Sequence, residues 1–215
     1  MGQYVLAIDQ GTTGTTALLI DANSLEIVAE GSQDYAQIYP RPGWVEHDLN
    51  VIWKTVEVTV TEALKKAKAT GKDIISIGIT NQRETTCAYD KAGKPLANAI
   101  VWQDRRTADF CAEHKSNFQQ KYTPRTGLPL DPYFSGSKMK WLLENVPTVK
   151  VAADKNDLRL STIDTFVLYK LTNGESFATE PSNASRTQLV SLETFEWDED
   201  LVKFFQIPKS ALPKI

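Results

Sequence analysis

The 215-residue chain has few cysteines, few histidines and no long apolar run, and each shortage excludes a class of protein. The two cysteines, Cys87 and Cys111, are too few for a disulfide framework and lack metal-ligand spacing, which indicates a reducing compartment such as the cytoplasm. The two histidines, His47 and His114, form no metal-binding or catalytic-triad pattern. No apolar stretch reaches the ~18 residues that a membrane-spanning helix needs.

The chain also lacks an excess of either charge, since 24 basic and 27 acidic residues give a net charge of −3. This balance provides no basic surface for nucleic acid. The N-terminus has no basic region followed by an apolar stretch, so we expect no signal peptide. Hydrophobic residues make up 41% and charged residues 24%, which is the mixture of a globular domain. A chain of this length buries roughly 70% of its unfolded surface, so its core needs no disulfide or metal.

The first part of the chain predicts a β-hairpin. Apolar runs over 5–8 and 17–20 flank a small, polar segment over 9–16. A third strand is expected over 27–29, and prolines and a glycine predict a loop over 36–47.

The segment 48–70 is ambiguous, because valines and threonines alternate over 55–61 as in a strand. Apolar residues recur at helical spacing over the whole segment, and its length decides for a helix. The isoleucine-rich segment Ile74-Ile75-Ser76-Ile77-Gly78-Ile79 predicts a buried strand over 74–79. Further strands are expected over 86–89 and 98–102, and helices near 104–120, 137–145, 161–171 and 199–205. This order indicates an α/β fold with a mixed β-sheet flanked by helices, as one domain with appended loops rather than two.

The polar segment Asp9–Thr16 is the first candidate for chemistry. Its glycines allow the backbone N–H groups to approach a ligand, and its threonine hydroxyls add hydrogen-bond donors for phosphate oxygens. The Asp9 carboxylate at the strand end suits Mg²⁺, directly or through water. The spacing is not that of a Walker loop, and no lysine is present. The alternative is an ordinary polar hairpin turn.

Two further candidates follow the predicted strands. Arg83 and Glu84 come after the 74–79 strand, where ligands often bind in open α/β sheets, and together they offer donors and an acceptor to a small polyol. The alternative for this pair is a surface ion pair. The aromatic residues Trp44, Trp102 and Tyr133 are suited to wall a pocket for the carbon side of a polyol, with core packing as the alternative.

Taken together, these segments resemble the FGGY family of carbohydrate kinases, from about residue 4 to the last residue. Within that family, the segments 81–85 and 131–134 are similar to those of members that act on glycerol. The matching strings, in chain order, are AIDQGTTGTTALLID (7–21), YPRPGWVEHD (39–48), IGITNQRETT (77–86), NAIVWQDRRTA (98–108), TGLPLDPYFSGSKMKWLLENV (126–146) and ASRTQLV (184–190).

The resemblance implies an actin-like ATPase fold of the ribonuclease H type, in which two related domains close on ATP and substrate. The implied activity is ATP:glycerol 3-phosphotransfer, which yields sn-glycerol 3-phosphate, and ATP and Mg²⁺ are the implied co-substrate and cofactor. Residues 1–215 match the first of the two domains, which carries the glycerol site and the phosphate loop. The implied site residues are Thr12, Arg83, Glu84, Trp102 and Tyr133 around glycerol, Thr12, Thr13, Gly14 and Thr16 at the nucleotide phosphates, and Asp9 at the metal.

Two departures from the family pattern matter. Thr16 stands where the family usually has an arginine aimed at the phosphates, and the loss of such a contact costs roughly tenfold in phosphate binding or rate. The family's general base, an aspartate, and its second, nucleotide-binding domain are expected beyond residue 215. We therefore expect no catalytic base in this chain, no phosphoryl transfer by residues 1–215 alone, and a homo-oligomer at full length.

Two other interpretations stay open from the sequence. Because the phosphate loop has diverged at Thr16, a polyol or sugar other than glycerol stays open as the substrate. A non-catalytic module that binds a polyol or pairs with a separate second half is the alternative from another class of protein. The reading frame after Ile215 discriminates between that module and the first domain of a longer kinase.

Overall fold

The computed structural model describes residues 2–215, and the chain divides into two compact units. The first unit runs to Gln37 and resumes over Leu49–Gln82. The second consists of Ile38–Asp48 and Arg83–Ile215. This division was not predicted from the sequence, because each unit draws on two separate stretches of chain.

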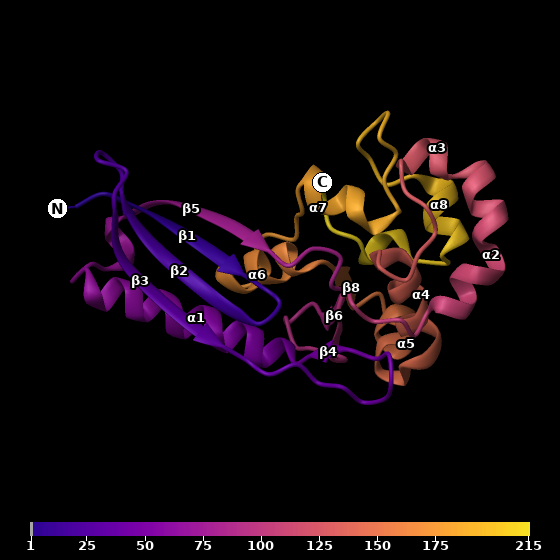
Figure 1. The fold of residues 1–215 in the computed structure, drawn as a ribbon, viewed down its shortest axis with the longest axis horizontal. Helices are drawn as coiled ribbons and strands as arrows, with labels where there is room; N and C mark the ends of the chain where they lie inside the picture. The colour runs from indigo at the N-terminus through magenta and orange to yellow at the C-terminus, as the bar shows by residue number, and fades with distance from the viewer. Residues whose placement is uncertain (1) are drawn as a thin grey trace. The chain divides into compact units, whose positions relative to one another are not determined.

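The first unit is a four-stranded sheet with one long helix, as Figure 1 shows. The strand order is β3-β2-β1-β5, in which β1 pairs with β2 and β2 with β3 in antiparallel fashion, whereas β1 and β5 are parallel. The predicted mixed sheet is therefore confirmed. The elements of this unit are β1 (Tyr4–Gln10), β2 (Gly14–Asp21), β3 (Ile27–Asp34), α1 (Leu49–Lys66), the 3-10 turn η1 (Gly71–Asp73) and β5 (Ile74–Asn81).

Helix α1 covers one face of this sheet. Alternate residues of the strands point to that face, and these residues are mostly apolar. Ile8, Ala17 and Gly31 lie opposite one another across β1, β2 and β3, and the helix packs on that row. A Cβ atom at Gly31 would lie 2.2 Å from the carbonyl oxygen of Thr59 in α1, so only glycine permits this approach. The long helix predicted over 48–70 is thus confirmed, with its end at Lys66.

Strand β5 differs from its prediction. The isoleucine-rich segment 74–79 indicated a buried strand, but Ile75 is 56% exposed and Ile77 is 47% exposed. The reason is position, because β5 is an edge strand whose only partner among the described strands is β1, and α1 packs mainly against β3 and β2. An apolar run does not by itself distinguish an edge strand from a central one.

The second unit combines two small sheets with most of the helices. Strand β4 pairs with β7, and β6 pairs with β8, both antiparallel. The helices predicted near 104–120, 137–145, 161–171 and 199–205 are confirmed as α2, α4, α6 and α8, whereas α5 and β8 were not predicted. The elements are β4 (Glu46–His47), β6 (Cys87–Asp90), β7 (Ala99–Ile100), α2 (Ala108–Lys121), α3 (Thr123–Thr126), α4 (Ser135–Asn145), α5 (Pro147–Asp154), β8 (Leu158–Ser161), α6 (Ile163–Leu171), α7 (Pro181–Ala184), η2 (Ser185–Thr187), α8 (Glu199–Phe204) and η3 (Lys209–Ala211).

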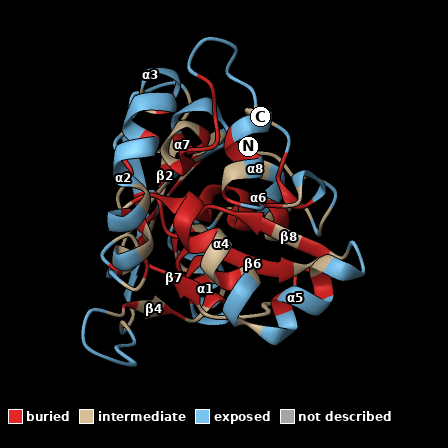
Figure 2. Cartoon of the chain, turned by 90° about the vertical axis from the view of Figure 1, so that its right-hand side faces the viewer, coloured by how far each residue is buried: buried red, intermediate tan, exposed pale blue. Residues whose placement is uncertain are grey.

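The core of the second unit is aromatic and aliphatic. Phe118 of α2 and Phe205 after α8 are fully buried, and their ring centroids lie 6.0 Å apart. Met139 and Leu142 of α4 belong to the same cluster. Figure 2 shows the result, with β6 and β8 buried and the outer face of α2 exposed. No helix in the described part of the chain combines the length and hydropathy needed to cross a membrane.

Candidate functional site

The segment Asp9–Thr16 comprises the end of β1, the tight turn over residues 11–13 and the start of β2. The Gly11 N–H donates to the carbonyl oxygen of Gly14 at 2.9 Å, and the Tyr35 N–H donates to the carbonyl oxygen of Thr13 at 3.0 Å. Thr13 is exposed, and Thr12 and Gly14 are half-buried. The turn therefore presents its backbone and a threonine side chain to solvent, as a phosphate-binding loop requires.

Three side chains hold this turn in place through the carbonyl oxygen of Gly11. It accepts hydrogen bonds from Gln10 Nε2 at 2.9 Å, from the Tyr35 hydroxyl at 2.5 Å and from Gln82 Nε2 at 3.2 Å. Gln82 Nε2 also donates to Gln10 Oε1 at 3.1 Å. Burial raises the pKa of Tyr35 to about 12, so the hydroxyl stays protonated and remains a donor. We call Gln10, Tyr35 and Gln82 the loop clamp.

The loop clamp was not predicted from the sequence. Its members come from β1, from the residue after β3 and from the residue after β5, and only the register of the sheet brings them together. The one sequence signal was that Gln10 and Gln82 each follow an apolar strand segment. A buried glutamine needs hydrogen-bond partners, so two of them at neighbouring strand ends predict a network.

Asp9 and Thr16 face each other across β1 and β2. Strand alternation puts both on the face opposite α1, and Thr80 of β5 lies next to Asp9 on that face. Asp9 is exposed and makes no hydrogen bond or ion pair with another described residue. Thr16 Oγ1 lies 3.1 Å from Ser32 Oγ of β3.

The donor chemistry of this face fits a hard cation held mainly by water and phosphate oxygens. An exposed carboxylate beside threonine hydroxyls supplies the oxygen ligands that Mg²⁺ prefers. The described residues contain no group of three or more His, Cys, Asp and Glu side chains that would enclose a metal by itself. A cation at Asp9 would therefore need further ligands from a nucleotide or from solvent.

In the second unit, Arg83 and Glu84 do not form the surface ion pair that was the alternative interpretation. Arg83 is exposed and has no hydrogen bond or ion pair with another described residue, whereas Glu84 is only 2% exposed. Glu84 has a φ of 62°, in the left-handed region that is uncommon outside glycine. Ser135 Oγ donates to its carbonyl oxygen at 3.0 Å. This strained turn separates the two neighbouring side chains.

The Glu84 carboxylate pairs with Arg186 instead. Arg186 Nε donates to Glu84 Oε1 at 2.6 Å, and the two residues are 102 positions apart in the sequence. The Arg186 guanidinium carbon also lies 4.9 Å from the centroid of the Phe134 ring and 5.9 Å from that of Tyr133. Arg186 was not among the predicted site residues, although the matching string ASRTQLV contains it.

The aromatic candidates divide into two groups. The rings of Trp102 and Tyr133 are both half-buried and meet edge to face with centroids 5.6 Å apart. Of the two rings, that of Tyr133 lies beside the Arg186 guanidinium. Trp44 has other neighbours: the guanidinium of the buried Arg106 stacks 3.8 Å from its ring centroid, and the Trp141 ring meets it edge to face. For Trp44, the packing alternative is the better description.

A buried lysine holds the Tyr133 segment through hydrogen bonds to its backbone. Lys138 of α4 is 0% exposed, and its Nζ donates to the carbonyl oxygens of Tyr133 at 2.6 Å and Phe134 at 3.0 Å. Burial lowers the pKa of Lys138 to about 7. Lys138 was not among the predicted site residues. The available signal was its position in a predicted helix, directly before Met139, which is also buried.

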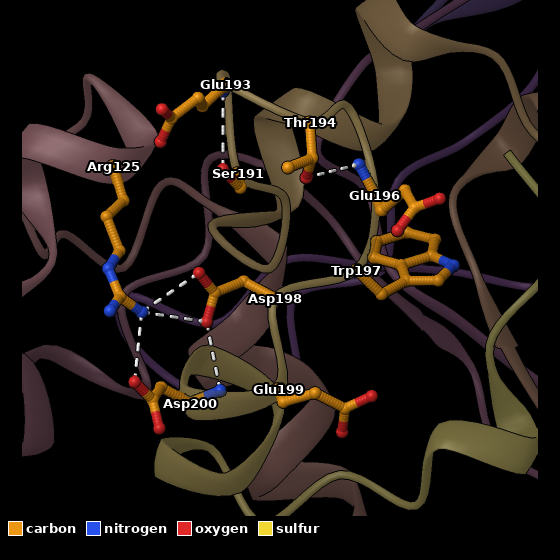
Figure 3. Close-up of a pocket in the computed structure, with 9 residues that line it drawn as sticks. All are labelled: Arg125, Ser191, Glu193, Thr194, Glu196, Trp197, Asp198, Glu199 and Asp200. Carbon is orange, nitrogen blue, oxygen red and sulfur yellow. Dashed lines mark hydrogen bonds and ion pairs between the residues drawn. The ribbon is translucent and has the colours of Figure 1, made fainter.

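The second unit also has an acidic hollow of about 430 Å³ that contains none of the predicted site residues. Figure 3 shows Arg125 reaching across it to two aspartates, with Nη1 3.0 Å from oxygens of both Asp198 and Asp200. Asp198 also accepts from the backbone N–H groups of Asp200 and Leu201 as the N-cap of α8. These contacts tie α3 to α8 and explain the acidic side chains by structure.

Comparison with known proteins gives the context for both groups of residues. The model of the FGGY family of carbohydrate kinases, N-terminal domain, matches residues 4–215. The glycerol kinase of Rhizobium rhizogenes is 49% identical over 100% of this chain and 43% of its own length. The structure of Plasmodium falciparum glycerol kinase with ADP superposes with a TM-score of 0.92 at 36% identity, over 100% of this chain and 43% of that one.

Kinases named for other substrates share the fold. The gluconate kinase of Lactobacillus acidophilus has a TM-score of 0.87 at 26% identity, over 100% of this chain and 42% of its own. The predicted actin-like, ribonuclease H-like α/β fold is thereby confirmed. The chain spans less than half the length of the relatives it matches. It belongs to the FGGY family of carbohydrate kinases and matches the N-terminal domain of that family.

Proposed function

We propose that this chain is the N-terminal domain of an ATP-dependent glycerol kinase, an enzyme that transfers the γ-phosphoryl group of ATP to glycerol to give sn-glycerol 3-phosphate and ADP. The observation that carries the proposal is the buried Glu84 carboxylate, which is paired with Arg186 next to the Trp102–Tyr133 ring pair. A carboxylate acceptor beside aromatic walls suits a small polyol with hydroxyls on one side and carbons on the other. The 49% identity to a glycerol kinase favours glycerol among such substrates.

The residues of the second unit take the substrate. Glu84 accepts hydrogen bonds from glycerol hydroxyls, and the exposed Arg83 donates to a hydroxyl oxygen. Trp102 and Tyr133 contact the carbon side and exclude water from it. Arg83 has no protein partner among the described residues, so it is available to a ligand.

The residues of the first unit take the phosphates. Backbone N–H groups of Thr12, Thr13 and Gly14 and the hydroxyls of the two threonines bind phosphate oxygens. Thr16 stands at the edge of this loop, and Thr12 also contacts the substrate. Asp9 holds Mg²⁺, directly or through water, and the ion, when bound, neutralises phosphate charge. The loop clamp fixes the turn before the nucleotide arrives, which lowers the cost of ordering it.

Three further points belong to the proposal. The general base, an aspartate, comes from the part of the enzyme beyond residue 215, so residues 1–215 supply binding and positioning only. The full-length enzyme is a homo-oligomer. It works in the cytoplasm, in keeping with two cysteines that are both free thiols.

A substrate panel tests the proposal. Full-length protein is incubated with ATP, Mg²⁺ and each of glycerol, dihydroxyacetone, erythritol and xylulose, and ADP release is measured. We expect kcat/KM for glycerol to exceed that for erythritol and xylulose by at least about a hundredfold, because hydroxyl-matched sites reject poorly matched analogues strongly. Preference for another polyol would overturn the substrate, and binding without any turnover would favour a non-catalytic module.

A further inference from the structure

We propose that Arg186 is a positioning residue for the polyol site, which fixes the Glu84 carboxylate so that one of its oxygens stays available to a substrate hydroxyl. The inference rests on the proposed function, because it assigns Glu84 to the substrate. It adds a residue from a distant part of the chain, which lies in the 3-10 turn η2 and touches the site through Glu84 and the aromatic rings.

Glu84 requires a cation at its carboxylate. The side chain is 2% exposed, and a buried carboxylate without a partner is strongly unfavourable. Arg83 next to it is exposed and does not pair with it, and the Nζ of the buried Lys138 is directed to two backbone carbonyls. Arg186 is the one cationic side chain in the described part of the chain that makes an ion pair with Glu84.

The Arg186 guanidinium is itself held in place. It lies over the Phe134 ring at 4.9 Å, and cation–π contact with a ring restrains the guanidinium plane. The turn that carries it is tied by Thr187 Oγ1, which donates to the carbonyl oxygen of Ala184 at 2.6 Å. With an exposed fraction of 28%, the Arg186 side chain sits between the buried carboxylate and solvent.

The two carboxylate oxygens of Glu84 differ in their hydrogen bonding. Oε1 accepts from Arg186 Nε, whereas Oε2 has no hydrogen-bond partner among the described residues. A charge-assisted hydrogen bond at one oxygen fixes the rotation of the carboxylate, so the other oxygen keeps one direction. Without Arg186, the carboxylate loses its ion-pair partner and its fixed direction, although the charge of Lys138 remains nearby, and the polyol loses an oriented acceptor.

The experiment measures steady-state kinetics of full-length protein with Arg186→Met and Arg186→Lys. Because substrate and transition state use the same hydroxyl contact, we expect Arg186→Met to raise the glycerol KM by roughly 10- to 100-fold and to leave the ATP KM within about threefold. Arg186→Lys keeps the charge but lacks Nε, so its KM falls between those of the wild type and Arg186→Met. An unchanged glycerol KM in both variants overturns the inference.

A double-mutant cycle separates positioning from a general loss of structure. In a Glu84→Gln background, Arg186→Met should change the glycerol KM by less than about threefold, because the group that it positions is gone. A full effect in that background overturns the inference. If Arg186→Met does not fold, the cycle with Arg186→Lys carries the same test.

Arg125→Met is the matched control, since Arg125 also makes ion pairs with carboxylates in the second unit but lies at the acidic hollow. We expect it to leave the glycerol KM unchanged, and an equal rise in this variant also overturns the inference. If the wild type prefers another polyol in the substrate panel, the cycle is run with that polyol. Failure of the proposed substrate and failure of the Arg186 inference are then distinguishable.

Discussion

Adjacent residues at the candidate polyol site have opposite environments. Arg83 is exposed and has no protein partner within the described residues, whereas Glu84 is buried and fixed by Arg186. The change in environment coincides with the left-handed backbone at Glu84. The protein therefore pre-organises Glu84, and under the proposed function Arg83 is left to be ordered by the ligand.

Arg83→Ala tests the second of these roles. A hydrogen bond from a charged donor contributes about 1.5–3 kcal/mol, so we expect the glycerol KM of the full-length enzyme to rise roughly 10- to 100-fold. Because Arg83 makes no contact that the fold needs, the thermal unfolding midpoint should stay within about 2 °C of the wild type. Arg125→Ala serves as the control, and an unchanged KM in Arg83→Ala contradicts the assigned role.

His47 predicts a pH dependence of stability. It lies fully buried in β4, and burial lowers its pKa from 6.5 to about 4. The folded protein keeps the imidazole neutral, whereas the unfolded chain binds a proton below pH 6.5, so the free energy of unfolding falls as the pH falls from 6.5 toward 4. This single group accounts for a loss of about 3 kcal/mol across that range.

The measurement is chemical denaturation at pH 7 and pH 4.5 for the wild type, His47→Gln and His114→Gln. We expect His47→Gln to lose less stability between the two pH values than the wild type does. His114 is half-buried on the surface of α2, so its variant should follow the wild type. Equal acid sensitivity in the His47 variant contradicts the assignment.

At the scale of elements, the β1–β2 turn is positioned by the sheet beneath it. The loop clamp joins the ends of three strand segments at one carbonyl oxygen, that of Gly11. A turn that binds phosphate through its backbone gains from such restraint, because the donors keep their direction without a ligand.

Tyr35→Phe removes the hydroxyl of the loop clamp with little change of volume. That hydroxyl donates to the Gly11 carbonyl oxygen and accepts from the Nε2 groups of Gln10 and Gln82. A hydrogen bond of this kind contributes about 1 kcal/mol, so we expect a loss of stability of at least about 1 kcal/mol and a three- to tenfold rise in the ATP KM. The glycerol KM should change less than the ATP KM. Tyr39→Phe at a 66% exposed tyrosine is the control, and an unaltered ATP KM in Tyr35→Phe contradicts the role of the clamp.

Elements were predictable from the sequence where the pattern is local. The β1–β2 hairpin and α1 follow from apolar runs and helical spacing within about 20 residues. Whether a strand lies at the edge or in the centre of a sheet depends on residues far away in the sequence. For this reason β5 was wrongly expected to be buried. The split into two units was equally invisible, since each unit combines two stretches of chain.

The candidate site follows the same rule. Glu84 and Tyr133 were named from their strings and their place after strands or before a helix. Arg186 is 102 residues from Glu84, and Gln82 is 72 residues from Gln10, so no spacing pattern predicts these contacts. Lys138 was missed for a different reason, because charged residues are rarely fully buried and a lysine is expected at the surface.

At the scale of the whole molecule, the chain carries candidate sites for phosphate and for polyol but spans 43% of a related glycerol kinase. Phosphoryl transfer needs positioning, charge stabilisation and a base together. We therefore predict that residues 1–215, purified alone with ATP, Mg²⁺ and glycerol, release no ADP above background. Full-length protein at the same concentration is the positive control, and glycerol-dependent turnover by the chain alone contradicts the prediction.

The central claim is that Glu84, oriented by Arg186, is the acceptor that holds glycerol. Its most direct measurement is the glycerol Kd of full-length protein by titration calorimetry without nucleotide, for the wild type and for Glu84→Gln. We predict saturable binding by the wild type and a Kd at least about tenfold higher in Glu84→Gln, as expected when a charged acceptor is lost. Equal glycerol affinity in the two proteins, both folded, would contradict it.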